Sequence, residues 1–257
     1  MSEVVVWGLG ELGCVFARGL LRTGHTVVPV LRDTDVAALA ARVPAPALVL
    51  VAVGESALPG VLAQMPAAWR ACVALLQNEL RPRDWERHGL AAPTLAVVWF
   101  EKKRGGDARV LLPTEIAGPG ASMLVAALSS LGLAAAHVAP EQALAALAAK
   151  NLYILTTNLA GLRVGGDVGA LVTAHRALAD ALLDDLLALE SALFAPQPVE
   201  HAAARAVFER ACASDPRHAC AGRSAPDRLA RTLAHADALG LALPAVRALA
   251  QSSLNDA

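Results

Sequence analysis

The spacing of apolar residues along the chain changes character near residue 139. Before that point, short apolar runs alternate with stretches of helical periodicity. The short runs predict strands at 4–7, 26–31, 47–53, 72–76, 95–100 and 109–112. The periodic stretches predict helices at 14–21, 36–42, 56–64 and 123–131. This alternation is typical of a mostly parallel sheet that is covered by helices.

After residue 139 the strand pattern disappears. Helical periodicity predicts helices at 141–162, 174–194, 200–212, 226–239 and 243–251. Pro140, Pro196, Pro198 and Pro216 separate them, as prolines do at helix boundaries. We therefore predict an α/β domain over residues 1–137, followed by an all-α domain over residues 138–257.

The second predicted strand, 26–31, should lie at an edge of the sheet. It contains Pro29, which removes one N–H donor and is poorly tolerated in a central strand. Only residues 33–46 separate this strand from the next apolar run. A short helix fits into that interval, but a further strand hardly does.

The first predicted strand leads directly into a glycine-rich turn, Gly8-Leu9-Gly10-Glu11-Leu12-Gly13, which is followed by a helix. In a G-x-G-x-x-G between strand and helix, the first glycine permits the tight turn. The second lets the backbone approach a pyrophosphate, and the third allows close packing of helix on strand. The N–H groups at the helix start then face the phosphates. The pattern predicts a Rossmann-type dinucleotide-binding domain with its cofactor at these six residues.

The end of the second predicted strand indicates which dinucleotide binds. Folds that bind NAD usually place an acidic residue there, on the ribose hydroxyls. Here the strand ends in Leu31-Arg32-Asp33. Arg32 suits a 2′-phosphate and predicts NADP(H), whereas Asp33 leaves NAD(H) open. Gly54 and Asn78 follow later strands, so we expect them at the same edge of the sheet.

Composition excludes several kinds of partner. The 257 residues carry a formal net charge of −1, so nothing favours a nucleic acid or an anionic membrane. The longest stretch with few charges, 142–162, is interrupted by Lys150 and two asparagines, which argues against membrane insertion. Glu3 precedes an immediate strand, so we expect no signal peptide. The four cysteines lack the spacing of a disulfide framework, which fits reduced thiols and a cytoplasmic location.

The same cysteines raise the question of a metal. Cys212, Asp215, His218 and Cys220 form the one cluster of metal-ligand residue types along the sequence. Their spacing matches no usual structural zinc site, so we predict no metal.

Lys150 is the candidate catalytic residue of the predicted all-α domain. It is the only charged residue between Glu141 and Arg163, and leucines and isoleucine surround it on several faces of its helix. A lysine buried there is costly unless it is paired or lines a cavity. It could donate a proton or a charge-assisted hydrogen bond to a carbonyl. Asn158 lies two turns away, about 80° around the helix, and could line the same site. The alternative is a structural lysine that reaches the surface or pairs with a neighbouring helix.

These motifs together resemble the ketopantoate reductase (2-dehydropantoate 2-reductase) family. The similar features are, in order, the G-x-G-x-x-G turn, Gly24-His25, Leu31-Arg32, Leu76-Gln77-Asn78, the helix with Lys150 and Asn158, Gly169 and Leu171, and Leu239–Pro244. The resemblance implies a C-terminal domain like that of 6-phosphogluconate dehydrogenase, which would bind substrate and form dimers. It also implies that Arg32 binds the 2′-phosphate of NADPH, that Asn78 lies beside the cofactor, that Lys150 is the general acid, and that Asn158 binds substrate.

The chain also departs from that family pattern. Gly54 stands where the family has a lysine, Ile154 where it has an asparagine, and Glu79 where it has a glycine. Ser224 falls near the position of its substrate-binding glutamate. We therefore expect a substrate other than ketopantoate.

Two functions remain open at this point. The first is an NADPH-dependent oxidoreductase, acting on CH–OH or on the matching keto (or imino) group of a small molecule. The second is a non-catalytic NADP(H)-binding sensor, or a protein that binds a partner, descended from such a reductase. In either case we expect a homodimer through the helical domain, and no nucleic-acid or membrane partner.

Overall fold

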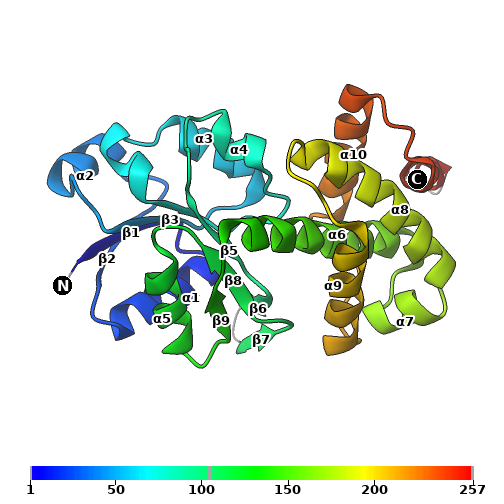
Figure 1. Cartoon of the computed structure of the whole chain (residues 1–257), viewed down its shortest axis with the longest axis horizontal. Coiled ribbons are helices and arrows are strands. Elements are labelled where there is room, and N and C mark those ends of the chain that lie inside the picture. Colours follow the sequence, from blue (N-terminus) through cyan, green and yellow to red (C-terminus); the bar gives the residue numbers. More distant parts are fainter. Residues whose placement is uncertain (1, 103–105, 256–257) are drawn as a thin grey trace. The chain divides into compact units, whose positions relative to one another are not determined.

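The computed structural model describes residues 2–102 and 106–255. The chain divides into two compact units, Met1–Ala146 and Leu147–Ala257. The first is built around a mostly parallel sheet with flanking helices, and the second is helical (Figure 1). The predicted fold class, a Rossmann-type α/β domain followed by an all-α domain, is confirmed.

The first unit contains a seven-stranded sheet in the order β2-β1-β3-β4-β5-β8-β9. Strands β1 to β5 run parallel, β8 is antiparallel to β5, and β9 is parallel to β8. The bounds are β1 Glu3–Trp7, β2 Thr26–Val30, β3 Leu48–Val51, β4 Val73–Leu75, β5 Thr94–Val97, β8 Thr114–Ala117 and β9 Ala135–His137.

Strand β2 lies at the edge of this sheet, as its proline predicted. Pro29 is in register with Val6 of β1. Because β2 pairs only with β1, the missing N–H of Pro29 can face away from the ladder at no cost in hydrogen bonds. The chain then crosses through α2 (Val36–Arg42) to β3 on the other side of β1.

The end of the first unit departs from the prediction. The apolar run 95–100 belongs to two strands, β5 and β6 (Phe100–Lys102). The run predicted at 109–112 is β7 (Ala108–Val110), which pairs with β6 in a separate two-stranded sheet. Part of the connection predicted at 101–107, residues 103–105, lies outside the described residues. Strands β8 and β9 were missed because they are short and contain Thr, Glu, Ala and His rather than an apolar run.

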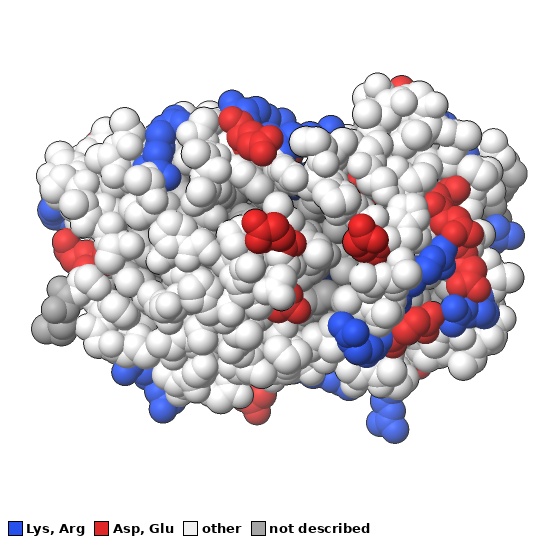
Figure 2. Space-filling model, viewed as in Figure 1, with Lys and Arg blue, Asp and Glu red and all other residues white. Residues whose placement is uncertain are grey.

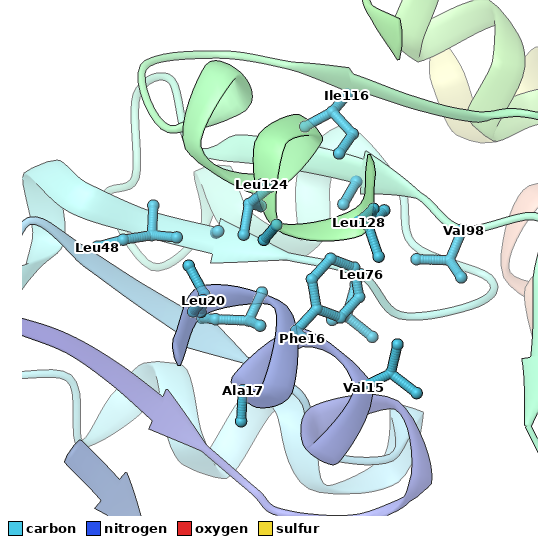
Figure 3. Packing of buried hydrophobic residues seen from close by; sticks show 14 of the residues in the cluster. Val15, Phe16, Ala17, Leu20, Leu48, Leu76, Val98, Ile116, Leu124 and Leu128 are labelled. Carbon is cyan, nitrogen blue, oxygen red and sulfur yellow. The ribbon is translucent and has the colours of Figure 1, made fainter. Parts of the chain in front are cut away.

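Helices cover both faces of the main sheet, with α1 and α5 on one face and α2, α3 and α4 on the other (Figure 1). Their bounds are α1 Glu11–Arg22, α3 Leu58–Ala63, α4 Pro82–Glu86 and α5 Ala121–Ser129, with short 3₁₀ helices at Glu55–Ala57 and Ala67–Cys72. Phe16 and Leu20 of α1 and Leu124 and Leu128 of α5 are fully buried against the sheet (Figure 3). This packing holds α1, and therefore the turn before it, against β1.

The second unit consists of packed helices. They are α6 Pro140–Val164, which begins in the first unit, and α7 Val168–Thr173, α8 Arg176–Phe194, α9 His201–Ser214, α10 Ala225–Leu239 and α11 Pro244–Asn255. Helix α8 packs against α7, α10 and α11. In its described part, β-type pairing is limited to one isolated bridge, between Asp167 and Ala219. None of the described helices is long and apolar enough to span a membrane.

Candidate functional site

The turn between β1 and α1 requires glycine at its first and last positions. Gly8 has a φ of 98°, in the region that favours glycine. A Cβ on Gly8 would lie 2.9 Å from the carbonyl oxygen of Ala52, and one on Gly13 would lie 2.0 Å from the carbonyl oxygen of Gly8. The first and third glycines therefore let the turn, the helix and β3 approach each other.

Gly10 is different because it faces open space. No heavy atom lies within 4 Å of a Cβ built at Gly10, and the residue is exposed. It caps the start of α1, whose first N–H groups have no partner within the helix. Leu9 and Glu11 beside it are also exposed, and Leu12 is half-buried. An open backbone at a helix N-terminus is what a pyrophosphate needs, so these residues fit a dinucleotide.

The ends of three strands, β1, β2 and β3, meet at this turn. The N–H of Gly8 donates to the carbonyl of Val30 at the end of β2 (3.0 Å), and the N–H of Ala52 after β3 donates to the carbonyl of Trp7 (2.8 Å). The chain leaves β1 for β2 on one side, and β3 lies on the other. Ligands of open α/β sheets bind outside the carboxyl ends of the strands at such a switch point. The glycine turn occupies that point.

Arg32 lies at the same edge, two residues after β2 ends at Val30. It is exposed, as is Asp33. Thr34 closes a small turn around them, since its Oγ1 accepts from the N–H of Leu31 at 2.9 Å. The structure thus brings Arg32 and Asp33 to the edge that carries Gly8.

Asn78 is half-buried and follows β4 at this edge. The residue before it, Gln77, was not predicted to have a role. Its Nε2 donates to the carbonyls of Val51 (2.7 Å) and Val53 (3.1 Å), so it ties the end of β4 to the end of β3. Glu79 has a φ of 57°. The backbone at this position therefore keeps a conformation natural to glycine although the residue is glutamate.

The predicted residues of α6 form a second group, in the helical unit. Lys150 and Asn158 are buried, with 5% and 9% of their surface exposed, and Ile154 between them is half-buried. Asn151, next to Lys150, donates from Nδ2 to Oε2 of the buried Glu190 of α8 at 3.1 Å. This part of α6 therefore carries several polar groups in a largely apolar surrounding.

Sequence reasoning missed Arg228. This residue is 7% exposed, and its Nη1 donates to Oδ1 of Asn158 at 2.7 Å. A signal was present, because Arg228 shares a helical face with the other buried residues of α10, Ala225, Leu229, Thr232 and Ala236. An arginine on the apolar stripe of an amphipathic helix indicates a buried partner.

The cysteines of the helical unit are thiols in apolar surroundings. Burial raises the pKa of Cys212 to about 12 and the pKa of Cys220 to about 11. All four cysteines of the chain are free. Across the described residues, no three His, Cys, Asp or Glu side chains lie close enough together to hold a metal ion.

The surface shows mixed charge. On the face drawn in Figure 2, acidic and basic side chains are interspersed over the helical unit. Charged side chains of the helical unit form ion pairs, among them Arg176 with Glu209 (2.8 Å) and Arg247 with Asp237 (2.6 Å).

Solved structures similar to this chain match it over nearly its whole length. A PanE/ApbA family ketopantoate reductase from Ralstonia eutropha JMP134 is 23% identical, with a TM-score of 0.66 over 96% of this chain and 95% of that one. D-mandelate dehydrogenase with NADH and anilino(oxo)acetate is 12% identical, with a TM-score of 0.66 over 97% and 96%. A dimeric ketopantoate reductase from Staphylococcus aureus is 13% identical, with a TM-score of 0.63 over 96% of each chain. No family model and no curated protein sequence matches the chain. The chain therefore has the two-part fold of the ketopantoate reductases, as the sequence resemblance predicted.

Proposed function

We propose that this protein is an NADPH-dependent reductase of a small keto or imino compound other than ketopantoate. The observation that carries the proposal is the glycine turn at the switch point of the sheet. Its middle glycine is open, its outer glycines are packed, and an exposed arginine lies at the end of the neighbouring strand. The same two-part fold occurs in ketopantoate reductases and in D-mandelate dehydrogenase.

The first unit would hold the cofactor. The backbone from Gly8 to Gly13 would face the pyrophosphate, and Arg32 would hold the 2′-phosphate in a bidentate, charge-assisted contact. Asn78 would lie beside the cofactor. The bound dinucleotide supplies a hydride, while the protein supplies binding, orientation and electrostatics.

Lys150 would be the general acid. It would hold a proton at Nζ and give it to the carbonyl oxygen (or imino nitrogen) of the substrate as the hydride reaches the adjoining carbon. The products would be an alcohol or amine and the oxidised dinucleotide. Asn158 would orient the substrate by a hydrogen bond to one of its oxygens. Anilino(oxo)acetate, present with NADH in the D-mandelate dehydrogenase structure, carries an oxo group next to a carboxylate, so 2-oxo acids are the first substrates to test.

The departures at Gly54, Ile154 and Ser224 support a substrate other than ketopantoate. The same departures favour the alternative of a non-catalytic NADP(H)-binding sensor or partner-binding protein. We also propose a homodimer through the helical domain, because one neighbour with this fold is dimeric.

The test is a titration of the purified protein with NADPH and NADH, followed by a panel of 2-oxo acids and cyclic imines under observation of nicotinamide absorbance. We expect the protein to bind NADPH more tightly than NADH and to oxidise NADPH with at least one compound. Tight binding of NADPH without turnover of any compound would reject the reductase and favour the non-catalytic sensor. Failure to bind either dinucleotide would reject both.

A further inference from the structure

The start of α10 is fixed against α6 close to Asn158. A Cβ on Gly161 of α6 would lie 2.5 Å from the backbone nitrogen of Ala221, so the backbones of the two segments touch. A Cβ on Gly222 would lie 3.5 Å from Oδ1 of Asn158. The N–H of Ala225 then donates to the carbonyl of Gly222 at 3.0 Å. The first turn of α10 is therefore held at a defined distance from the Asn158 amide.

Arg228 lies in that first turn, where helix stability alone does not favour it. The N-terminal end of a helix carries partial positive charge, so a cation there is unfavourable. Burial of the guanidinium adds a desolvation cost. Its 2.7 Å contact with Oδ1 of Asn158 is a short, charge-assisted hydrogen bond that offsets part of these costs.

The contact decides which way the Asn158 amide points. A guanidinium has N–H donors and no acceptor, so the amide atom that faces Arg228 must be the oxygen. The NH₂ group then points away from Arg228. The contact of Nδ2 with Oγ1 of Thr157 measures 3.5 Å, at the limit of a hydrogen bond. Nδ2 of Asn158 is therefore a donor that makes only a weak hydrogen bond within the protein.

We propose that Arg228 is a positioning residue, which holds the Asn158 amide so that its NH₂ group binds an accepting oxygen of the substrate. By withdrawing electrons through Oδ1, the guanidinium also makes that NH₂ group a stronger donor. The site then selects molecules that present a carboxylate or carbonyl oxygen to Asn158. This inference rests on the proposed function, in which Asn158 contacts the substrate.

Three substitutions separate this role from a purely structural one. R228M keeps most of the volume and removes every donor, so the amide is free to turn. R228K retains donors that face Oδ1. N158D keeps an oxygen towards the guanidinium and removes the NH₂ group. R223M, in the preceding loop, removes an exposed guanidinium and is the matched control.

The readouts are KM and kcat for the best 2-oxo acid of the panel, the dissociation constant for NADPH, and the melting temperature. We expect R228M and N158D to raise KM about tenfold, as for loss of one hydrogen bond to a charged group. We expect R228K to recover most of that loss, R223M to leave KM unchanged, and every variant to bind NADPH like the wild type. N158D should retain the wild-type melting temperature, because the contact with Arg228 is kept.

Unchanged KM in a folded R228M variant, with an active wild type, would overturn the positioning role and leave the proposed function standing. If R228M does not fold, N158D and R228K decide the question. If the wild type reduces no compound of the panel, the proposed function fails first and the inference falls with it.

Discussion

The two groups of candidate residues are built in opposite ways. In the first unit, the candidate cofactor site is mostly backbone: a glycine turn, a helix start and the ends of parallel strands. In the helical unit, the candidate substrate site consists of side chains, and its best-defined contact joins Asn158 to Arg228 across 70 residues of sequence. A backbone site depends on local conformation and tolerates varied side chains. A side-chain site changes its specificity with a few substitutions, and the departures from the family pattern at Ile154 and Ser224 both lie in this unit.

Lys150→Met gives the strongest test of this contrast. It preserves the volume of the side chain and removes the proton donor, so turnover should fall by about two to four orders of magnitude. NADPH affinity should barely change, since the proposed cofactor residues are in the other unit. The free energy of unfolding should change much less than turnover does, because Met fills nearly the same volume. Single-turnover kinetics with urea unfolding would check this. Retained turnover with altered stability would mark Lys150 as a structural lysine.

Arg32→Ala should affect the cofactor and not the chemistry. The variant lacks the guanidinium that would hydrogen-bond to the 2′-phosphate. NADPH binding should therefore weaken by about 1.5–3 kcal/mol, while NADH binding stays nearly unchanged. Fluorescence titration with both dinucleotides measures the difference. Equal losses for both, or tighter binding of NADH by the wild type, would assign the ribose to Asp33 instead.

Gly13→Ala and Gly10→Ala form a matched pair within one turn. The Cβ of Gly13→Ala would lie 2.0 Å from the carbonyl oxygen of Gly8, so we expect a destabilisation of about 1–3 kcal/mol, typical of overpacking. The Cβ of Gly10→Ala meets nothing within 4 Å, so it should leave stability unchanged and weaken only dinucleotide binding. Urea unfolding and NADPH titration of both variants test this. Equal destabilisation by the two would show that Gly10 is needed for folding rather than for the ligand.

The smallest expected effect concerns pH and the buried Cys212. Its pKa is raised from 9.0 to about 12, chiefly by burial. Below pH 9 the thiol is protonated in both folded and unfolded chains, so it adds no pH dependence. Above pH 9 the unfolded chain ionises first, and stability falls until the folded thiol also ionises near pH 12. By about pH 10 the loss should be roughly 1 kcal/mol.

Urea unfolding at about pH 8 and pH 10 would measure this loss for the wild type and for Cys212→Ala. The variant should lose less stability between the two pH values than the wild type does. Cys14→Ala, at an exposed position, is the control and should behave like the wild type. Identical losses for all three proteins would contradict the buried-thiol explanation.

Much of the first unit could be predicted from the sequence, because its determinants are local. Valines at 4–6 predict a strand buried on both faces, and β1 is one. Pro29 placed β2 at the edge, and the topology agrees. Gly13 contacts Gly8 within the same motif, so this part of the turn is set locally, whereas the close approach of Gly8 to Ala52 depends on the packing of β3. The prediction failed at β8 and β9, where short segments of Thr, Glu, Ala and His become strands because a sheet edge is there to pair with them.

The sequence by itself thus determined the order of most elements, the glycine turn and the isolation of Lys150 in an apolar helix. Each of these depends on residues within a few turns or one strand of each other. Only the tertiary structure decided that Gln77 ties β4 to β3, that Asn151 faces Glu190, and that Arg228 holds the Asn158 amide. Such contacts join residues 26, 39 and 70 positions apart. A buried hydrogen bond at that separation depends on how whole elements pack, and no local pattern specifies its partner.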